Sequence, residues 1–429
     1  MTNSIDANRD QDSAAFAIPL SSASATGPTV VVLATQWETS SEAGWITRQV
    51  AGALACLGTV HVVTPGGGIA SVRTDGVFTV HHLGGLLRPQ ALVEGNVVAD
   101  ALAAVDRAAR EQSALTGPMR PETTLLDRGL TEAWSPASGV LDDLRPDLIV
   151  LADHRNLGAL AAIQRHSPTA PVALVALDDG RGHLELAEFA PVLDRADAVL
   201  AITEAERLRL EARMAARGMS APVTRIGAPM VANSSARSEP NTWVGDSDYL
   251  FVLTDTSSED ASVQTELARL LTLRFCDRPV GIAHTDGFFA WHEGRFNDGW
   301  AIERSSDRAR LMAWARVTID LRHASLFGRD VVESLLFGTP VVVPHDSQAR
   351  QHAHLGGGGL WFEGPADLTW ATEALLDPAL SEQLSRQGKA YAEELFGSTD
   401  RFIDRVIEAC QLDVSDLPEV VRSPSAAQA

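Results

Sequence analysis

Lysine is almost absent from this chain. Of the 35 basic residues among its 429, a single one, Lys389, is a lysine, and the others are arginines. Acidic residues outnumber basic ones by 56 to 35, which gives a formal net charge of -21. A protein of this charge is repelled by phosphate backbones and by anionic lipid headgroups. We therefore expect neither nucleic acid nor an anionic membrane surface as a partner.

Long apolar runs and cysteines are also scarce. No apolar run approaches the roughly 20 residues of a membrane span, so no transmembrane segment is predicted. The acidic N-terminus lacks the basic and apolar regions of a signal peptide. Three cysteines, Cys56, Cys276 and Cys410, lie far apart without metal-ligand spacing. We expect each to be a small core residue of a protein that works in the reducing cytoplasm.

Buried strands alternate with helices along most of the chain. Residues 28–34, 42–58 and 59–68 have the pattern strand, helix, strand, which implies a parallel sheet with a right-handed crossover. The polar segment 231–242 interrupts the alternation, and a new first strand follows at 248–254. Since the chain exceeds the size of one ordinary core, the predicted fold class is α/β, with two doubly wound domains in tandem.

One stretch, SLFGRDVVESLLFGTPVVVP at residues 325–344, carries the motif that matters most. Apolar residues at helical spacing predict a short helix closed by Gly338, and the valines after Pro340 predict a buried strand. Glu333 places a carboxylate inside the apolar stretch. Because Asp330 precedes it by three residues, the two also have the spacing of a capping box, and that alternative stays open.

This stretch resembles the donor-binding signature of glycosyltransferase family 4. The pattern of that family is Glu, any residue, Phe-Gly, four residues, Glu, then Gly-x-Pro-Val. The matching positions are Phe327, Gly328, Glu333, Gly338, Pro340 and Val341. The resemblance covers most of residues 28–411 and is strong in the last quarter. It implies the GT-B fold, in which two facing Rossmann-like domains enclose a cleft, and transfer from a nucleotide diphosphate sugar with retention and usually without a metal.

Composition marks the two tails and the boundary near residue 231, and the resemblance implies the roles of the parts between them. The expected parts are a disordered tail at 1–27, an N-terminal acceptor-side domain at 28–230, a C-terminal nucleotide-sugar-binding domain at 231–396, a helix at 397–412 that returns to the N-terminal domain, and a loose tail at 413–429.

By the same resemblance, Glu333 binds the ribose hydroxyls and the N-terminus of its helix faces the donor phosphates. Gly328 would let the backbone approach the ligand. His154 follows a buried strand, where α/β enzymes present catalytic groups, so it is the candidate catalytic residue; a loop histidine with an ordinary partner is the alternative. The candidate nucleotide-sugar-binding residues are Glu333, Gly328, Phe327, Ser325, Arg329, Arg322, Ser347, Arg350 and Gly44.

Two positions depart from the family pattern. Ser325 stands where the family has its first glutamate. The basic pair that usually follows the first strand of the donor domain is missing, since residues 253–262 contain no basic residue. Arg322, Arg329 and Arg350 are the candidates to replace it, although a plain surface role for Arg329, and a plain surface loop at Ser347 and Arg350, remain alternatives.

Other residue groups have simpler interpretations. His345, Asp346, His352 and His354 have no helical i, i+4 pairing, so no metal site is expected. The glycines at 356–359 predict a flexible connector. Gly44 stands alone after the first strand, and the absence of G-x-G-x-x-G disfavours a nicotinamide-dependent dehydrogenase.

The sequence thus leads to two functional hypotheses. The first is a cytoplasmic, metal-independent, retaining glycosyltransferase with no cofactor beyond its donor substrate and with an unidentified acceptor. The second is a catalytically degenerate protein of the same fold that binds a ligand or a protein partner, because a departing diphosphate without cations lacks stabilisation.

Overall fold

The structure, a computed structural model, describes most of the regular elements of the chain. The described residues are 27–34, 42–65, 70–83, 137–152, 169–177, 195–216, 222–230, 249–255, 260–284, 287–292, 295–300, 305–323 and 327–412, with single positions at 37, 134, 159, 163, 166, 167 and 218. The chain divides into two compact units. The N-terminal unit holds the described residues up to Gly227 and those from Asp400 onward, and the C-terminal unit holds those from Ala228 to Thr399.

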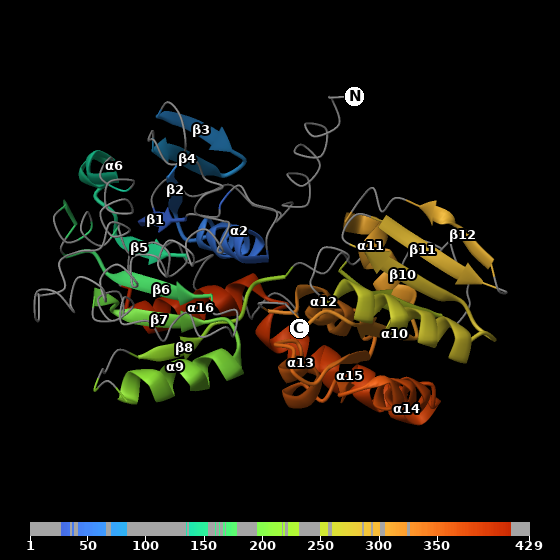
Figure 1. Cartoon of the computed structure of the whole chain (residues 1–429). Coiled ribbons are helices and arrows are strands. Elements are labelled where there is room, and N and C mark those ends of the chain that lie inside the picture. The colour runs from blue at the N-terminus through green and yellow to red at the C-terminus, as the bar shows by residue number, and fades with distance from the viewer. Residues whose placement is uncertain are drawn as a thin grey trace, which may run out of the picture. The chain divides into compact units, whose positions relative to one another are not determined.

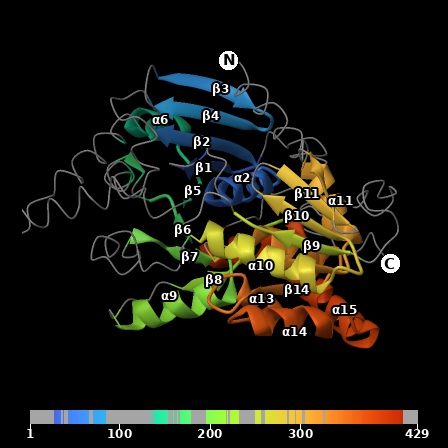
Figure 2. The same cartoon turned by 45° about the vertical axis from the view of Figure 1, so that its right-hand side comes forward.

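The N-terminal unit is built on an eight-stranded sheet with the order β3-β4-β2-β1-β5-β6-β7-β8. Neighbouring strands are parallel except for β3 and β4, which form an antiparallel pair at one edge (Figures 1 and 2). The strands are β1 (Thr29–Leu33), β2 (Thr59–Pro65), β3 (Ser71–Asp75), β4 (Phe78–Leu83), β5 (Leu148–Leu151), β6 (Val172–Ala176), β7 (Ala198–Ala201) and β8 (Val223–Arg225).

The central strands of this sheet are short apolar runs because helices cover both of their faces. All residues of β5, β6 and β7 are buried. The helices described in full are α2 (Glu42–Leu54), α6 (Ala137–Leu144), α9 (Glu204–Ala216) and α16 (Thr399–Cys410). The β3–β4 hairpin was not predicted from the sequence: Gly76 turns it with φ of 61°, and the residues of β3 are largely exposed. A helix predicted at 97–113 lies outside the described residues.

The C-terminal unit has a seven-stranded sheet with the order β12-β11-β10-β9-β13-β14-β15. Its strands are β9 (Leu250–Leu253), β10 (Val280–His284), β11 (Gly287–His292), β12 (Arg295–Trp300), β13 (Val317–Asp320), β14 (Val341–Pro344) and β15 (Gly359–Phe362). Strands β10, β9, β13, β14 and β15 are parallel. The β11–β12 hairpin, which the sequence analysis did not predict, extends one edge by antiparallel pairing.

In this unit the structure describes the helices α10 (Ala261–Arg274), α11 (Ser305–Trp314), α12 (Arg329–Leu336), α13 (Arg350–Leu355), α14 (Pro365–Leu375) and α15 (Pro378–Leu395). Asp377 caps α15, where its carboxylate accepts from the N–H groups of Ala379 and Leu380. Helix α16, although it follows α15 in the chain, groups with the N-terminal unit from Asp400 onward. Within that unit Arg405 Nη1 donates to Ile226 O at 3.2 Å.

Helices α12 and α15 pack against each other unusually closely. A Cβ at Gly358 would lie 2.7 Å from the Cα of Gly388 in α15 and 2.6 Å from Leu335 Cδ2 in α12. A Cβ at Gly359 would lie 2.2 Å from Val341 O. The prediction of a flexible connector at 356–359 is therefore wrong for these two glycines, because they are packed in contacts that exclude any side chain.

The cysteines differ in their surroundings. Cys410 is buried and Cys56 is half-buried, but Cys276 is exposed just after α10, so the expectation of a core position is wrong for Cys276. Cys410 also has the pKa of its thiol raised to about 12, chiefly by burial, with a contribution from Asp197. Within the described part of the chain, no helix is both long and apolar enough to cross a membrane.

Candidate functional site

The candidate site lies at the switch point of the C-terminal sheet. Strand β9 pairs with β10 on one side and with β13 on the other, so successive connections leave β9 in opposite directions. Ligands of doubly wound sheets bind where such strands end. Thr254 and Asp255 follow β9, Asp320 ends β13, and α12 begins shortly beyond it. The residues of the donor-binding motif, from Phe327 to Glu333, lie in the turn after β13 and in α12.

Gly328 begins α12 in a conformation that favours glycine. It is the N-cap residue and has φ of 79° and ψ of 46°, in the left-handed region. A Cβ at this position would lie 2.8 Å from the Cβ of Ala349, the residue that precedes α13. The turn into α12 therefore needs glycine both for its backbone and for its close contact with the start of α13.

The capping-box alternative for Glu333 is wrong. No side chain caps the N-terminus of α12, and its N-cap residue is Gly328 rather than Asp330. The Asp330 carboxylate accepts from two guanidinium groups instead. Its Oδ2 lies 2.7 Å from Arg308 Nη2 and 2.8 Å from Arg322 Nη2.

Arg322 is held in place by a second carboxylate at the end of β13. Its Nε donates to Asp320 Oδ1 at 2.7 Å and its Nη2 to Asp320 Oδ2 at 2.8 Å, a bidentate pair. The backbone N–H of Arg322 also donates to Asp320 Oδ1, at 3.0 Å. Because Asp320 is fully buried, it fixes the guanidinium where the strand ends.

The charges at this edge balance. The cationic side chains are Arg308, Arg322 and Arg329, and the carboxylates are Asp320, Asp330 and Glu333. Burial opposes ionisation throughout. At Asp330 the three arginines outweigh burial and hold the pKa below its usual value. At Arg322 its two carboxylate partners outweigh burial and raise the pKa further. At Arg308 burial prevails over Asp330 and lowers the pKa.

Glu333 differs from its acidic neighbours. It lies half-buried in the second turn of α12. Burial is the largest influence and raises the pKa of its carboxyl group; Asp330 raises it further, while Arg329 and Arg308 act in the opposite direction. A carboxylate in this setting gains from any ligand that supplies hydrogen-bond donors, because such donors stabilise the ionised form.

Phe327 belongs to a buried aromatic cluster rather than to an open surface. Its carbonyl oxygen lies 2.7 Å from Nε2 of His352, and Nδ1 of His352 lies 3.0 Å from the hydroxyl of Tyr391. The rings of Phe327 and His352 pack edge to face, with Phe396 against both. Burial lowers the pKa of His352 to about 4, so the ring is neutral and donates from Nε2 to the turn before α12.

Ser347 lies in the turn after β14, and Arg350 is the first residue of α13. The Ser347 hydroxyl is buried and donates to Pro344 O at 2.9 Å, a local bond within the turn. The Arg350 guanidinium carbon lies 5.2 Å from the ring centroid of Trp361, and Nη1 donates to His345 O at 3.4 Å. The aromatic face of Trp361 thus orients the Arg350 cation.

Three further candidate residues from the sequence analysis, Ser325, His154 and Gly44, do not lie among the described residues of this site. Ser325 and His154 lie outside the described residues. Gly44 is buried in the first turn of α2, in the N-terminal unit. Among the described residues, no group of three potential metal ligands is found. His352 contacts Phe327 and Tyr391, whereas Asp346 contacts His323, with Oδ1 at 2.7 Å from Nδ1. His352 and Asp346 therefore have different partners.

The sequence analysis did not single out Arg308 or Asp320. Asp320 carried a signal, since it is a carboxylate at the end of an apolar strand and is followed two residues later by an arginine. Arg308 carried none, because α11 joins the site only through the packing of α11 on α12.

Solved structures share this architecture. A trehalose-phosphate synthase from Burkholderia vietnamiensis matches with a TM-score of 0.59 at 14% identity, over 90% of this chain and 99% of that one. A sucrose-phosphate synthase from Thermosynechococcus elongatus matches with a TM-score of 0.57 at 12% identity, over 90% and 100%. The chain has the GT-B fold. The Anabaena protein HepE, solved in complex with UDP and glucose, is a further GT-B match, with a TM-score of 0.54 at 13% identity over 90% and 99%.

Sequence comparison adds no closer relative. No family model matches the chain, and no curated protein matches it in sequence. At these identities the structural matches establish the fold alone.

Proposed function

We propose that the protein is a glycosyltransferase that moves a sugar from a nucleotide diphosphate sugar to an acceptor, with retention of configuration. The single observation that carries the proposal is Glu333, a half-buried carboxylate near the N-terminus of α12, at the switch point of a GT-B C-terminal sheet. HepE, of the same fold, was solved with UDP and glucose. A uridine nucleotide is accordingly the first donor to test.

The proposed roles follow from the geometry at this edge. Glu333 accepts hydrogen bonds from the ribose hydroxyls. The N–H groups at the start of α12 and the cations Arg329 and Arg350 face the diphosphate, which is the charge that grows as the sugar departs. Phe327 and Gly328 shape the turn that brings this backbone close to the donor. Ser325 and Ser347 are proposed to contact the nucleotide sugar and His154 is proposed as the catalytic residue, as the sequence analysis assigned them.

The alternative, a catalytically degenerate binding protein, draws support from one observation. Arg322 and Arg308 are engaged by Asp320 and Asp330, so the described part of this edge has no excess of positive charge. An uncompensated diphosphate leaving group loses transition-state stabilisation, about 2.7–4 kcal/mol for each missing contact of this kind.

The experiment has two stages. In the first, a panel of nucleoside diphosphates and their sugars is screened by thermal shift, since a ligand that binds the native state raises Tm. Calorimetric titration then compares wild type with Glu333→Gln. We expect a 10- to 100-fold weaker Kd, because charge-assisted bonds to two hydroxyls, together worth about 1–3 kcal/mol, become neutral ones. Glu373→Gln, on the exposed surface of α14, is the matched control and should bind like wild type.

The second stage measures release of nucleoside diphosphate from the sugar nucleotide that binds. Turnover supports the transferase. Tight, Glu333-dependent binding without turnover, in the presence of a broad acceptor panel, supports the alternative. Equal affinity of wild type and Glu333→Gln for the nucleotide would show that Glu333 does not bind it.

A further inference from the structure

A depression of about 440 Å³ lies in the C-terminal unit, at the opposite edge of the sheet from the candidate site. It is lined by Arg316, Gly338, Pro378, Ser381, Glu382, Ser385, Arg386 and Lys389. Arg316 immediately precedes β13 and Gly338 follows α12, so this pocket adjoins the amino ends of β13 and β14. Its volume falls in the range of small-molecule sites, roughly 300–1,000 Å³.

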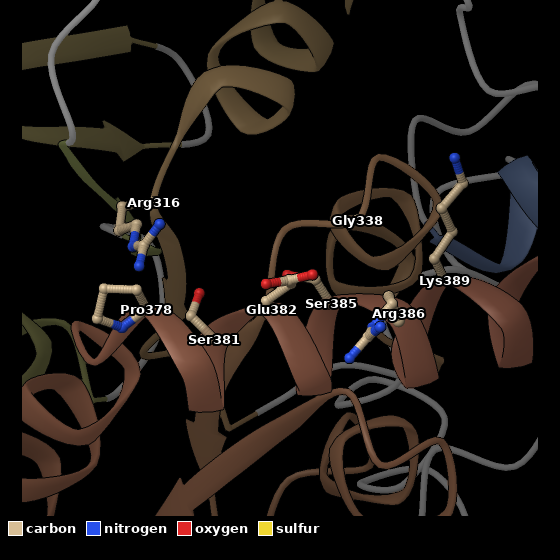
Figure 3. Close-up of a pocket in the computed structure, with 8 residues that line it drawn as sticks. All are labelled: Arg316, Gly338, Pro378, Ser381, Glu382, Ser385, Arg386 and Lys389. Carbon is tan, nitrogen blue, oxygen red and sulfur yellow. The ribbon is translucent and has the colours of Figure 1, made fainter.

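One face of α15 supplies most of the lining. Residues 378, 381, 382, 385, 386 and 389 recur at the three- and four-residue spacing of a helical stripe. Figure 3 shows these side chains along the helix, with Arg316 lying opposite Ser381. The N–H groups at the start of α15 do not contribute, because the carboxylate of Asp377 already accepts from two of them.

Among the residues that the structure describes, the charges that line this pocket are unbalanced. The pocket is lined by Arg316, Arg386 and Lys389 against a single carboxylate, Glu382. In the described part of the chain, neither Arg316 nor Arg386 forms an ion pair. Lys389 lies 3.6 Å from Glu393, but both are well exposed, so this pair is weak.

Such an arrangement is uncommon in so acidic a chain. With 56 acidic residues available against 35 basic ones, a guanidinium group readily finds a carboxylate, as Arg308, Arg322 and Arg274 do. Cations gathered without partners around a cavity favour a ligand that supplies the negative charge. The hydroxyls of Ser381 and Ser385 and the carboxylate of Glu382 add hydrogen-bonding groups for a ligand that also carries hydroxyls.

We infer that this pocket binds a small hydroxylated molecule with a phosphate group, at a site separate from the candidate donor site. Arg316, which lies opposite Ser381, holds the phosphate with its forked donors, while Arg386 and Lys389, farther along α15, add positive charge that attracts the anion. Glu382 accepts from hydroxyl groups of the same molecule and disfavours anions that lack them. The inference does not depend on the proposed transferase activity.

The test uses the full chain and calorimetric titration at low salt with glycerol 3-phosphate, inorganic phosphate and glycerol. We expect glycerol 3-phosphate to bind more tightly than phosphate, and glycerol not to bind. Arg316→Gln and Arg386→Gln should each weaken binding of glycerol 3-phosphate at least about tenfold. Arg269→Gln, which removes an exposed cation on α10, is the control and should leave it unchanged.

A variant that is expected to tighten binding shows that the losses in the arginine variants are not caused by unfolding. Glu382 is exposed, so Glu382→Gln should fold normally, and it removes a charge that repels anions. It should tighten binding of inorganic phosphate several-fold while weakening the preference for glycerol 3-phosphate over phosphate. Absence of binding at 10 mM ligand, on the order of the weakest affinity that calorimetry resolves, would overturn the inference. Binding that survives both arginine variants but is lost in Arg329→Gln would overturn it too, because the anion would then occupy the candidate donor site.

Discussion

Arg316 and Arg322 flank the same short strand, β13, yet they differ in every electrostatic respect. Arg322, at the carboxyl end, forms ion pairs with Asp320 and Asp330, and Arg308 forms a further ion pair with Asp330. Arg316, at the amino end, forms no ion pair among the described residues and lines an open pocket with two further cations. Helix α12 (Arg329–Leu336) runs between these two edges, with Gly328 as its N-cap and Phe337 as its C-cap.

The comparison shows that a count of arginines does not reveal where positive charge is available. Among the described residues, the edge with the recognisable motif is internally neutralised, and the edge without any motif has more basic than acidic side chains. Breaking a buried pair leaves an uncompensated charge and costs far more than removing a solvated one. The following substitutions test this contrast, beginning with the largest expected effect.

Asp330→Asn removes the carboxylate that Arg308 and Arg322 share. Since its side chain is about one-tenth exposed, both cations lose a partner in a poorly hydrated setting. We expect the free energy of unfolding to fall by about 3–5 kcal/mol, measured by urea denaturation. Glu373→Gln, which breaks the exposed pair with Arg274, is the control and should cost about 0–1 kcal/mol. Similar losses of unfolding free energy in both variants would mean that the ion pairs of Asp330 contribute no more than an exposed pair does.

Gly328→Ala tests the backbone of the same edge. Alanine in the left-handed region costs about 1–2 kcal/mol, and its Cβ would press on Ala349. With an overpacking cost of about 1–3 kcal/mol, we expect a loss of about 2–4 kcal/mol in urea denaturation. Gly364→Ala is the control, because its φ is extended and a Cβ there meets nothing within 4 Å. An unchanged stability for Gly328→Ala would mean that α12 can begin elsewhere.

His352 gives this edge a dependence on pH. Burial lowers its pKa from an ordinary value of 6.5 to about 4 in the fold, so the neutral ring is the form that the fold stabilises. Its contribution is fully present above pH 6.5 and is lost as the pH falls from 6.5 toward 4. Between pH 6.5 and 5 we expect a loss of about 2 kcal/mol, at 1.36 kcal/mol for each pH unit.

The measurement for His352 is urea denaturation at both pH values. In His352→Asn the loss over this interval should be smaller by that amount, whereas His354→Asn, an exposed change on the same helix, should behave as wild type. Parallel pH profiles for His352→Asn and wild type would show that other groups cause the dependence.

Arg316→Gln is expected to have the smallest effect. Because Arg316 has no ion-pair partner among the described residues and lies near other cations, its removal should change stability by less than about 0.5 kcal/mol. Arg322→Gln, at the other end of β13, should cost about 3 kcal/mol or more. A large loss for Arg316→Gln would reveal a structural role and would weaken the case for a ligand at the amino edge.

Much of the C-terminal unit could be predicted from the sequence because its signals are local. Strands β9, β13 and β14 are short apolar runs bounded by polar or turn residues, and α14 and α15 each begin with proline at the first helical position. The motif from Phe327 to Val341 indicated the edge of the sheet that carries the candidate site. The hairpins β3–β4 and β11–β12 were missed because one strand of each, β3 (SVRTD) and β12 (RFNDGW), contains several polar residues and lacks the continuous apolar character of the central strands.

By itself, then, the sequence determined the alternation of strands and helices, the restart of that alternation near Tyr249, and the motif that contains Glu333. These depend on neighbouring residues and on spacing along the chain. Only the tertiary structure decided that Asp330 binds arginines instead of capping a helix, that His352 supports the turn at Phe327, and that Gly358 meets Gly388. It also brought Arg316 beside α15. Each of these contacts joins elements distant in sequence, and their energies depend on burial and approach distance, which no local pattern encodes.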